Sequence, residues 1–552
     1  MLIILISRLF YLQIINFTKY RNIAYKNRIL IIPILPLRGN IFSKDKILLA
    51  SNKKSYRLLL NKIKYIQNKN ILNKIQQVLN LSNDKLIEMR KIIQNASYKS
   101  YGIIINNLSW SDILTIESNF NNADGLIIEV YYLRDYSESL MFCHIVGYAK
   151  FTDNEILSIN EQENFYNLNN FNQTELYSEL LPSKVKLQLG MCGAEMIYND
   201  ILKGKIGYTA IETDVYGNHI KQKETVSSIN GTDIDLTIDA KMQKILFEEL
   251  SENSCGIITN LKDNSLIAMV SKPGFDTNKL NNNISSLDWQ EIINSNALLN
   301  KCIQGQYNPG SIFKLVTIMC ALENGISSDF VVNCTSRPFL GEHFHCWYKP
   351  GHGAVKSMQD AIAKSCNHYM FTIAKILGIK NILNTAKKFG LGTKTNINLP
   401  FEKIGSLNNP NKNLATLLML SIGQGFITAT PIQLNKILCI IANGNYSIVN
   451  YVKNQKKLEQ NKVNQANFNK SKSNEAQINQ NTTELSKEEL GIIFNENIKK
   501  NFEDINNVNK KLFTENNLNN FLNSKSKEDQ IFKQEHLLIL RQGLYQAVNL
   551  PF

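Results

Sequence analysis

The sequence lacks the patterns that mark several common classes of protein. Its net charge is +14, from 61 Lys and Arg against 47 Asp and Glu, but no basic stripe is interleaved with aromatic residues. Nucleic-acid binding is therefore not indicated. Such a charge is typical either of attraction to an anionic surface or of compositional bias. Because Asn, Ile and Lys are heavily used throughout, we favour the compositional interpretation.

The sequence also lacks a disulfide framework and a signal-peptide cleavage site. The nine cysteines are odd in number and irregularly spaced, so they give no indication of a disulfide framework. Most of them are typical of small buried hydrophobic residues. No small-residue cleavage site of the signal-peptide kind follows the first apolar stretch.

That apolar stretch, residues 1–16, is interrupted by Ser7 and Arg8. A membrane-spanning helix needs about twenty apolar residues, so the stretch resembles the outer half of such a helix, with Tyr11 near the interface. We interpret it as a partial transmembrane anchor that either is marginal in itself or has an upstream part. A buried amphipathic helix is the alternative.

The length of 552 residues is enough for two or three domains. Strand-like and helix-like segments are mixed, which predicts an α+β, multidomain fold. A polar segment at 218–231 is the predicted boundary between an N-terminal domain at residues 17–225 and a second domain at residues 230–552. Within these, 150–185 is a predicted loose insertion, and about 452–533 is of low complexity.

The chemistry centres on residues 308–314, Asn-Pro-Gly-Ser-Ile-Phe-Lys, which open a predicted helix. Ser311 lies at the start of this helix and Lys314 lies one turn further on. A hydroxyl becomes a good nucleophile only when a base removes its proton, and a lysine amine in partly dry surroundings can be that base. Alone, the S-x-x-K pattern is more typical of an ordinary helix start with a Ser cap, and only the accompanying motifs overturn that interpretation.

A second pattern, Ser365-Cys366-Asn367, follows at a distance that makes the pair specific. The Ser365 hydroxyl can shuttle a proton between Lys314 and a leaving amine, and the Asn367 carboxamide can hold a substrate amide. Further along, Gly423-Gln424-Gly425 precedes another predicted helix.

With these motifs the chain resembles the class B penicillin-binding proteins, and most closely penicillin-binding protein 2, the elongation D,D-transpeptidases. The resemblance runs nearly end to end and its motifs lie in the right order. They are Arg38-Gly39-Asn40-Ile41, His144-Ile145-Val146-Gly147-Tyr148, Gly190-x-x-Gly193-x-Glu195, Leu236-Thr237-Ile238-Asp239, Tyr307 to Ser311, Gly351-His352-Gly353, Ser365 to Asn367, and Arg541 to Asn549.

The resemblance implies an elongated pedestal, or dimerisation, domain at 17–225 and a serine transpeptidase domain of the β-lactamase-like α/β kind at 230–552. It implies a single-pass protein of the cytoplasmic membrane with its bulk in the periplasm. Ser311 would attack a stem peptide of peptidoglycan, and β-lactams would acylate the same residue. It also implies an elongation glycosyltransferase and shape proteins as partners. No cofactor is required for acyl transfer.

Some members of this family hold zinc beside the active serine, and the resemblance implies a similar site here. Its ligands would be Cys334, Cys346, His352 and Cys366, a Cys₃His set suited to tetrahedral zinc. Cys366 would tie the metal to the loop that carries Ser365 and Asn367, so we interpret the metal as structural. Three buried cysteines and a loop histidine without metal are the alternative.

The third family motif, Lys-Thr-Gly, does not occur in the sequence. Lys394-Thr395-Asn396 is the nearest string, and we reject it because it precedes Gly423 and ends in Asn. We therefore interpret the transpeptidase domain as incomplete and truncated before that motif, with two central strands near 255–259 and 266–270. Slow acylation or none is the expectation for such a domain. An inactive binding or scaffold module and a β-lactam sensor or β-lactamase are the alternatives, and the long pedestal disfavours the last.

Overall fold

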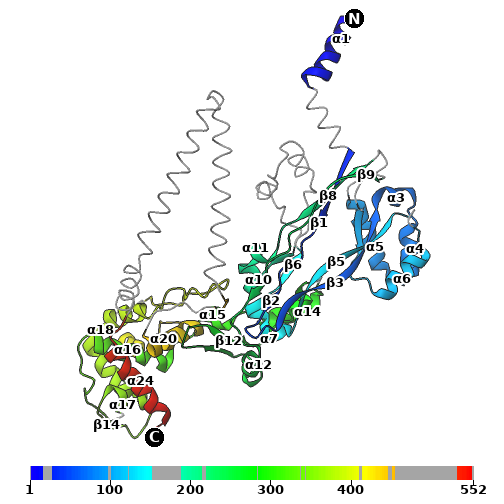
Figure 1. The fold of residues 1–552 in the computed structure, drawn as a ribbon. Helices are drawn as coiled ribbons and strands as arrows, with labels where there is room; N and C mark the ends of the chain where they lie inside the picture. The colour runs from blue at the N-terminus through cyan, green and yellow to red at the C-terminus, as the bar shows by residue number, and fades with distance from the viewer. Residues whose placement is uncertain are drawn as a thin grey trace.

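The computed structural model is elongated, with the N-terminus at one end and α24 (Gln534–Asn549) at the other (Figure 1). The predicted insertion at 150–185 and the low-complexity segment at 452–533 lie almost wholly outside the described residues. The structure describes residues 2–16, 28–96, 101–121, 124–151, 188–213, 219–281, 284–335, 337–341, 344–408, 413–444, 451–453 and 531–549.

The apolar N-terminal stretch forms α1 (Leu2–Phe10), which continues as a π-helical turn, η1 (Tyr11–Ile15). Large side chains such as Ile4 and Ile14 are exposed here. Among the described residues, no helix combines the length and the apolar character needed to cross a bilayer.

The N-terminal half is built on a sheet with the order β10-β2-β3-β4, in which β5 also pairs with β3. The pairing of β3 with β5 is antiparallel and runs from Ala50 opposite Tyr136 to Leu60 opposite Leu126. The strands are β2 (Ile41–Phe42), β3 (Leu48–Asn61), β4 (Tyr101–Ile105), β5 (Leu126–Tyr136) and β10 (Ile234–Asp235).

Four helices make a lobe on this sheet, and they bury a core around Leu58, Leu60 and Ile104. Each of three of them begins at a polar side chain that accepts backbone N–H bonds, as at Ser109 before α6, which forms a capping box with Asp112. The helices are α3 (Lys62–Gln67), α4 (Ile71–Val78), α5 (Asn83–Asn95) and α6 (Trp110–Asn119).

A separate antiparallel sheet has the order β1-β8-β9. Pro33 lies in β1 opposite Tyr208, and β1 is an edge strand, where the missing N–H of proline is tolerated. The strands are β1 (Ile29–Ile34), β8 (Gly207–Thr213) and β9 (His219–Val226), and a short pair is formed by β6 (Ala149–Phe151) and β7 (Gln188–Gly190). The helices nearby are α7 (Ser139–Val146), α10 (Gly193–Ile197) and α11 (Asn199–Leu202).

A buried ion network joins these parts. Glu195 of α10 accepts from Arg38 Nε at 2.6 Å and from Arg134 Nε at 2.6 Å, and all three side chains are at most 4% exposed. The hydroxyl of Tyr136 donates to the same carboxylate at 3.2 Å. Burial acts to raise the pKa of Glu195, but Arg134 and Arg38 together hold it below its usual value. The Arg38 and Glu195 motifs of the sequence thus meet in one structural contact.

The second domain contains the predicted hairpin of β11 (Cys255–Thr259) and β12 (Leu266–Ser271), whose register runs from Cys255 opposite Ser271. In the part of the chain that the structure describes, this sheet has two strands. The preceding strand, β10, was expected to open this domain, but it pairs in parallel with β2 of the N-terminal sheet.

A helical core of mainly apolar residues packs around α16 (Phe313–Glu323), which is buried along almost its whole length. The remaining helices of this half are α12 (Ala240–Glu249), α13 (Thr277–Asn281), α14 (Ser286–Asn294), α15 (Lys301–Gln304), the 3₁₀ turn η4 (Gly310–Ile312), α17 (Met358–Ala363), α18 (Asn367–Lys388), α19 (Leu414–Ser421), α20 (Pro431–Asn443) and α24. A small antiparallel pair is formed by β13 (Val332–Cys334) and β14 (Gly353–Val355).

Candidate active site

Ser311 lies in the 3₁₀ turn η4, directly before α16, rather than in the first turn of the α-helix itself. Its side chain is exposed, whereas Lys314 in α16 is 5% exposed. Gly310 has φ +60° and its N–H donates to the carbonyl of Gly423 at 2.8 Å. A Cβ on Gly423 would lie 2.1 Å from the Gly310 oxygen, so glycine is required there for the two segments to meet.

The four predicted catalytic residues converge. Lys314 Nζ donates to Ser365 Oγ at 2.8 Å, to the Ser365 carbonyl at 2.7 Å and to Asn367 Oδ1 at 2.7 Å. The Ser365 hydroxyl in turn lies 3.3 Å from Ser311 Oγ. A chain of polar contacts therefore runs from the exposed serine through a second hydroxyl to the buried amine.

Ser365 reaches this position through an unusual backbone, with φ +47°. Residues other than glycine rarely adopt this left-handed conformation, and it persists only where the surroundings enforce it. Here the N–H of Ser365 donates to Ile362 and that of Cys366 donates to Ala361, each at 3.0 Å. The end of α17 thus turns the hydroxyl toward Lys314.

The surroundings of Lys314 change its acidity. Burial lowers the pKa of its amine to about 8, although nearby Cys346 and Cys366 act in the opposite direction. An amine with this pKa is neutral in a much larger fraction near neutral pH than an exposed lysine, so it can accept a proton.

These residues line a cavity of about 370 Å³. The sequence motifs supplied most of its lining, but the sequence analysis did not select Trp347 and used Gln424 only for its order in the chain. Trp347 is 53% exposed, and its indole N–H donates to the Lys364 carbonyl at 3.2 Å. The one feature of the sequence that could have pointed to Trp347 is its position directly after Cys346, a predicted metal ligand. The lining is Ser311, Lys314, Trp347, Ser365, Asn367, Ile422 and Gln424.

The four predicted metal ligands also come together, with their donor atoms all within 4.8 Å of one another. Antiparallel pairing sets Cys334 opposite Gly353 and so brings it beside His352. The Sγ atoms of Cys346 and Cys366 are 4.0 Å apart, and His352 Nδ1 lies 3.4 Å from Cys346 Sγ and 3.7 Å from Cys334 Sγ. Tetrahedral zinc with bonds of about 2.3 Å needs sulfurs about 3.8 Å apart, so the donor set fits.

Hydrogen bonding from the Cys366 thiol is the main cause that lowers the pKa of Cys346 to about 4, while the pKa of Cys366 is raised. The shift of Cys346 favours the thiolate, which is the form of a cysteine that binds metal.

The rejected string Lys394-Thr395-Asn396 does not line the cavity. The N–H and hydroxyl of Thr395 both donate to the buried Glu402 carboxylate, at 2.7 and 2.6 Å. Its role in the structure is to fix a turn.

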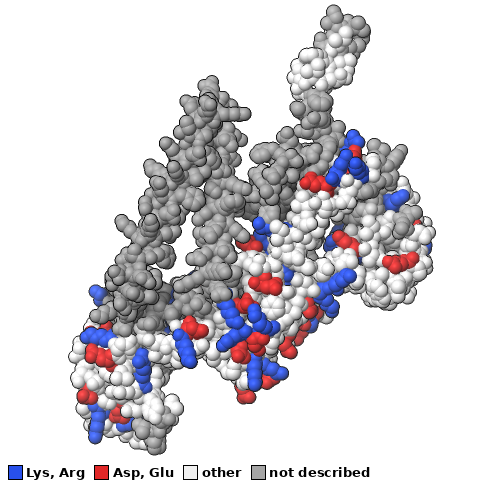
Figure 2. Space-filling model, in the orientation of Figure 1, with Lys and Arg blue, Asp and Glu red and all other residues white. Residues whose placement is uncertain are grey.

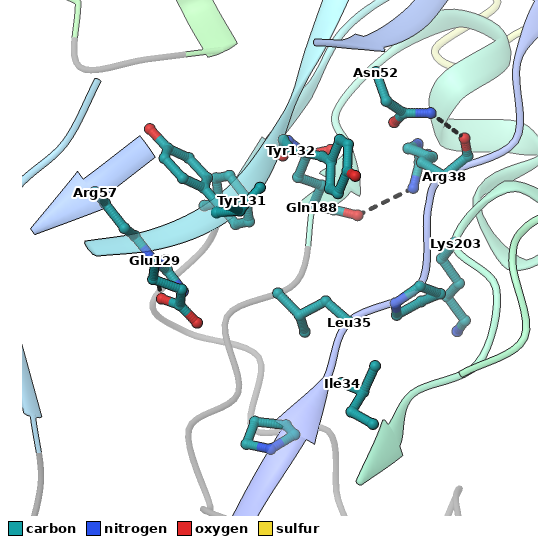
Figure 3. A pocket seen from close by; sticks show the side chains of 14 residues that line it. Ile34, Leu35, Arg38, Asn52, Arg57, Glu129, Tyr131, Tyr132, Gln188 and Lys203 are labelled. Atoms are coloured by element: carbon teal, nitrogen blue, oxygen red, sulfur yellow. Dashed lines mark hydrogen bonds and ion pairs between the residues drawn. The ribbon is translucent and has the colours of Figure 1, made fainter. Parts of the chain in front are cut away.

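A second cavity, of about 290 Å³, lies in the N-terminal half between the end of β1 and strand β5 (Figure 3). Arg38 lies at its edge and donates to the Gln188 carbonyl at 3.0 Å, and Asn52 donates to the Arg38 carbonyl. Arg57 pairs with Glu129 on neighbouring strands. None of the predicted catalytic or metal-binding residues is in its lining.

Lys and Arg are intermingled with Asp and Glu over the described part of the face in Figure 2. This mixture agrees with the compositional interpretation of the net charge.

Two family models together match most of the chain. The Penicillin-binding Protein dimerisation domain matches residues 33–236, and the Penicillin binding protein transpeptidase domain matches residues 254–491. The chain is a class B penicillin-binding protein. The predicted family and its two-domain α+β fold are thereby confirmed.

Relatives of this penicillin-binding protein include two proteins named peptidoglycan D,D-transpeptidase MrdA. The protein of Acinetobacter baumannii is 28% identical over 469 residues, which are 82% of this chain and 67% of the relative. That of Escherichia coli K12 is 28% identical over 80% of this chain and 70% of the relative.

Solved structures of similar fold include the complex between penicillin-binding protein 2 and MreC from Helicobacter pylori, with a TM-score of 0.65 and 23% identity over 77% of this chain and 80% of that chain. Penicillin-binding protein 2 of Pseudomonas aeruginosa in complex with WCK 5153 has a TM-score of 0.52 and 22% identity over 77% of this chain and 73% of that chain.

Proposed function

We propose that this penicillin-binding protein is a peptidoglycan D,D-transpeptidase of cell elongation that works through an ester on Ser311. The observation that carries the proposal is the contact chain from Ser311 Oγ to Ser365 Oγ, at 3.3 Å, and on to Lys314 Nζ, at 2.8 Å. The transpeptidase domain and the activity named for the MrdA relatives support it.

In the first half-reaction, the neutral amine of Lys314 is the base. A neutral amine has two N–H donors and one lone pair, so two of its three contacts keep their direction, to the Ser365 carbonyl and to Asn367 Oδ1. The lone pair then accepts from Ser365, whose oxygen accepts the proton of Ser311. Ser311 Oγ attacks the D-Ala-D-Ala carbonyl of the stem peptide, the peptide C–N bond breaks, and the proton returns to the departing D-alanine.

In the second half-reaction, an amine of a neighbouring stem peptide attacks the ester. The same relay takes its proton and returns one to Ser311 Oγ as the ester bond breaks, so no cofactor is consumed. Asn367, with its carboxamide oxygen fixed by Lys314 and its Nδ2 3.4 Å from the His345 carbonyl, is placed to hold the substrate amide. Trp347 and Ile422 supply apolar walls.

Zinc held by Cys334, Cys346, His352 and Cys366 is part of the same proposal. Bound there, it would supply a structural cross-link between the β13–β14 pair and the loop of Ser365 and Asn367. The separations of the donor atoms support it. Metal analysis of the purified chain tests this point: about one zinc per chain is expected, and much less in Cys346→Ser. A metal-free wild type would contradict it.

We also propose, from the family, a single-pass anchor in the cytoplasmic membrane, a periplasmic location and a role in cell shape. MreC accompanies the Helicobacter relative, and a shape protein of that kind and an elongation glycosyltransferase are the proposed partners. For the domains we retain a partial anchor at 1–16, a pedestal at 17–225 and a transpeptidase domain at 230–552.

The test is acylation of the full chain by a fluorescent penicillin, followed by intact mass and peptide mapping. We expect one adduct on Ser311, formed slowly because the sequence contains no Lys-Thr-Gly motif. We expect no adduct in Ser311→Ala, and labelling at the wild-type rate in Ser251→Ala, which alters an exposed serine outside the cavity. A folded chain that takes no label would contradict the proposal and favour a binding module. Rapid release of hydrolysed penicillin would favour a β-lactamase.

A further inference from the structure

Two sulfurs of the cysteine–histidine cluster belong to two segments that each contribute residues to the lining of the active-site cavity. Cys366 is the residue between Ser365 and Asn367, and Cys346 lies in the loop that carries Trp347. Their Sγ atoms are 4.0 Å apart, and both residues are fully buried. A disulfide bond needs about 2.05 Å between the sulfurs, so an approach of about 2 Å would join them.

The segment around Cys346 lies at the surface, although the Cys346 side chain itself is buried. Cys346 is the one buried residue between positions 345 and 350, and its neighbours His345 and Trp347 are exposed. Cys366, in contrast, is fixed at the start of α18 within the main core of the domain.

The same loop contacts the catalytic segment on both sides of the sulfur pair. Asn367 Nδ2 lies 3.4 Å from the His345 carbonyl, and Trp347 Nε1 donates to the Lys364 carbonyl at 3.2 Å. The Trp347 ring also packs against His352, with ring centroids 5.6 Å apart. A displacement of Cys346 therefore displaces a wall of the cavity and a partner of Asn367.

We propose that Cys346 and Cys366 are a redox switch, which a small peroxide closes to a disulfide and which then lowers acylation of Ser311. The inference rests on the proposed function of Ser311. The Cys346 sulfur attacks a peroxide oxygen, the O–O bond breaks, and the thiol becomes a sulfenic acid as water leaves. The Cys366 thiol then attacks that sulfur, the S–S bond forms, and water leaves.

In total, two thiols and one hydrogen peroxide give one disulfide and two waters. A dithiol reductant reverses the change by thiol–disulfide exchange. The disulfide removes two of the four metal donors, so closure of the switch and loss of zinc occur together.

The experiment uses the full, metal-loaded chain and stoichiometric hydrogen peroxide. Peptide mass spectrometry maps disulfides, a chromogenic chelator measures released zinc, and a fluorescent penicillin gives the acylation rate constant before oxidation, after it, and after dithiothreitol. We expect a Cys346–Cys366 disulfide, released zinc, and acylation slowed at least about tenfold, because displacements near 1 Å at reacting groups have effects of this size or larger. Dithiothreitol with zinc restores the rate.

Two variants distinguish the effect of the Cys346–Cys366 disulfide from the effects of oxidation at other residues. In Cys346→Ser, peroxide should leave that variant's own rate unchanged, whereas Cys439→Ser, which alters a buried cysteine outside the cluster, should respond like the wild type. The proposal is overturned if the mapped disulfide joins another pair, such as Cys255 and Cys302, or if the disulfide forms and the rate does not change.

Failure of the proposed function is a separate result. If the reduced chain is never acylated, the function of Ser311 is wrong, and with it the effect of the switch on acylation. The disulfide map and the zinc release then still decide whether the sulfur pair closes.

Discussion

At the scale of single residues, the site depends on the buried amine of Lys314, which uses all three of its hydrogen-bonding positions. Lys314 has three contacts, and they come from two residues of one short segment, Ser365 and Asn367. A protonated lysine amine donates three hydrogen bonds and so needs three acceptors when it is buried. The neutral amine donates two and accepts one, so one of the three partners must then donate. The same geometry therefore accommodates both protonation states.

The acidity of Lys314 gives the first prediction. Its pKa is lowered to about 8, so the reactive neutral form increases as pH rises through that value. We expect the rate constant for acylation of the chain by a fluorescent penicillin to rise about tenfold per pH unit below pH 8 and to level off above it. A rate that is flat from pH 6 to 9 would exclude Lys314 as the base.

The sequence predicted the polar side chains that converge around Lys314 because each lies in a short motif, whereas the four Cys and His side chains that also converge were implied only by the family resemblance. It did not reveal Trp347 as a wall of the cavity, since no local pattern says which way an exposed loop folds. Nor did it reveal the left-handed backbone of Ser365, which is imposed by hydrogen bonds to the end of α17. Arg134, the second partner of Glu195, was missed because its contact is formed by packing distant in sequence.

At the scale of elements, the position of the nucleophile is set by a glycine contact between η4 and the segment after α19. Gly423 has φ +75° and its Cα faces the Gly310 carbonyl. The hydrogen bond between Gly310 N–H and the Gly423 carbonyl holds the turn of Ser311 at this point.

Gly423→Ala tests this contact. The new Cβ would lie 2.1 Å from the Gly310 oxygen, so we expect the turn of Ser311 to shift and penicillin acylation to fall about a hundredfold. Gly378→Ala is the matched control, because its φ is +71° but nothing lies within 4 Å of the added Cβ. If both variants were acylated equally slowly, the loss would come from a side chain at positive φ and not from the clash with Gly310.

The ion network of Glu195 gives a prediction for the pedestal elements. In Glu195→Gln the buried guanidinium groups of Arg38 and Arg134 no longer face a negative charge. We therefore expect the free energy of unfolding of the N-terminal half to fall by about 3–5 kcal/mol. Glu88→Gln, which removes an exposed pair with Lys85, should change it by less than about 1 kcal/mol. Urea denaturation followed by tyrosine fluorescence checks both.

The pH dependence of that network has a definite sign. The pKa of Glu195 is lowered in the folded chain, so its contribution is present above the unfolded pKa and is lost as pH falls through the folded one. The wild type should therefore lose more stability than Glu195→Gln on acidification.

At the scale of the whole molecule, the two halves are connected by more than a linker. Ile234 N–H donates to the Asn40 carbonyl at 2.9 Å and Leu236 N–H to the Phe42 carbonyl at 2.8 Å, which ties β10 to the pedestal sheet. Three residues later, Asp239 N–H donates to Ile267 of β12. The sequence could not predict this parallel partner, since pairing between distant segments has no local signal.

Ile234→Pro tests the connection. The substitution removes the N–H that bonds Asn40 and should speed hydrogen exchange in both β2 and β12 by about tenfold or more. Ile234→Val keeps the N–H and should leave exchange in both strands nearly unchanged. Faster exchange confined to β2 would show that the two halves open independently.

The parallel pairing of β2 with β10 limits how the two halves of the molecule can move relative to each other. Because β10 is hydrogen-bonded to β2 and Asp239 is hydrogen-bonded to β12, the two halves cannot rotate freely about a linker. A load applied to the sheet that contains β2 is therefore passed through β10 toward the hairpin of β11 and β12.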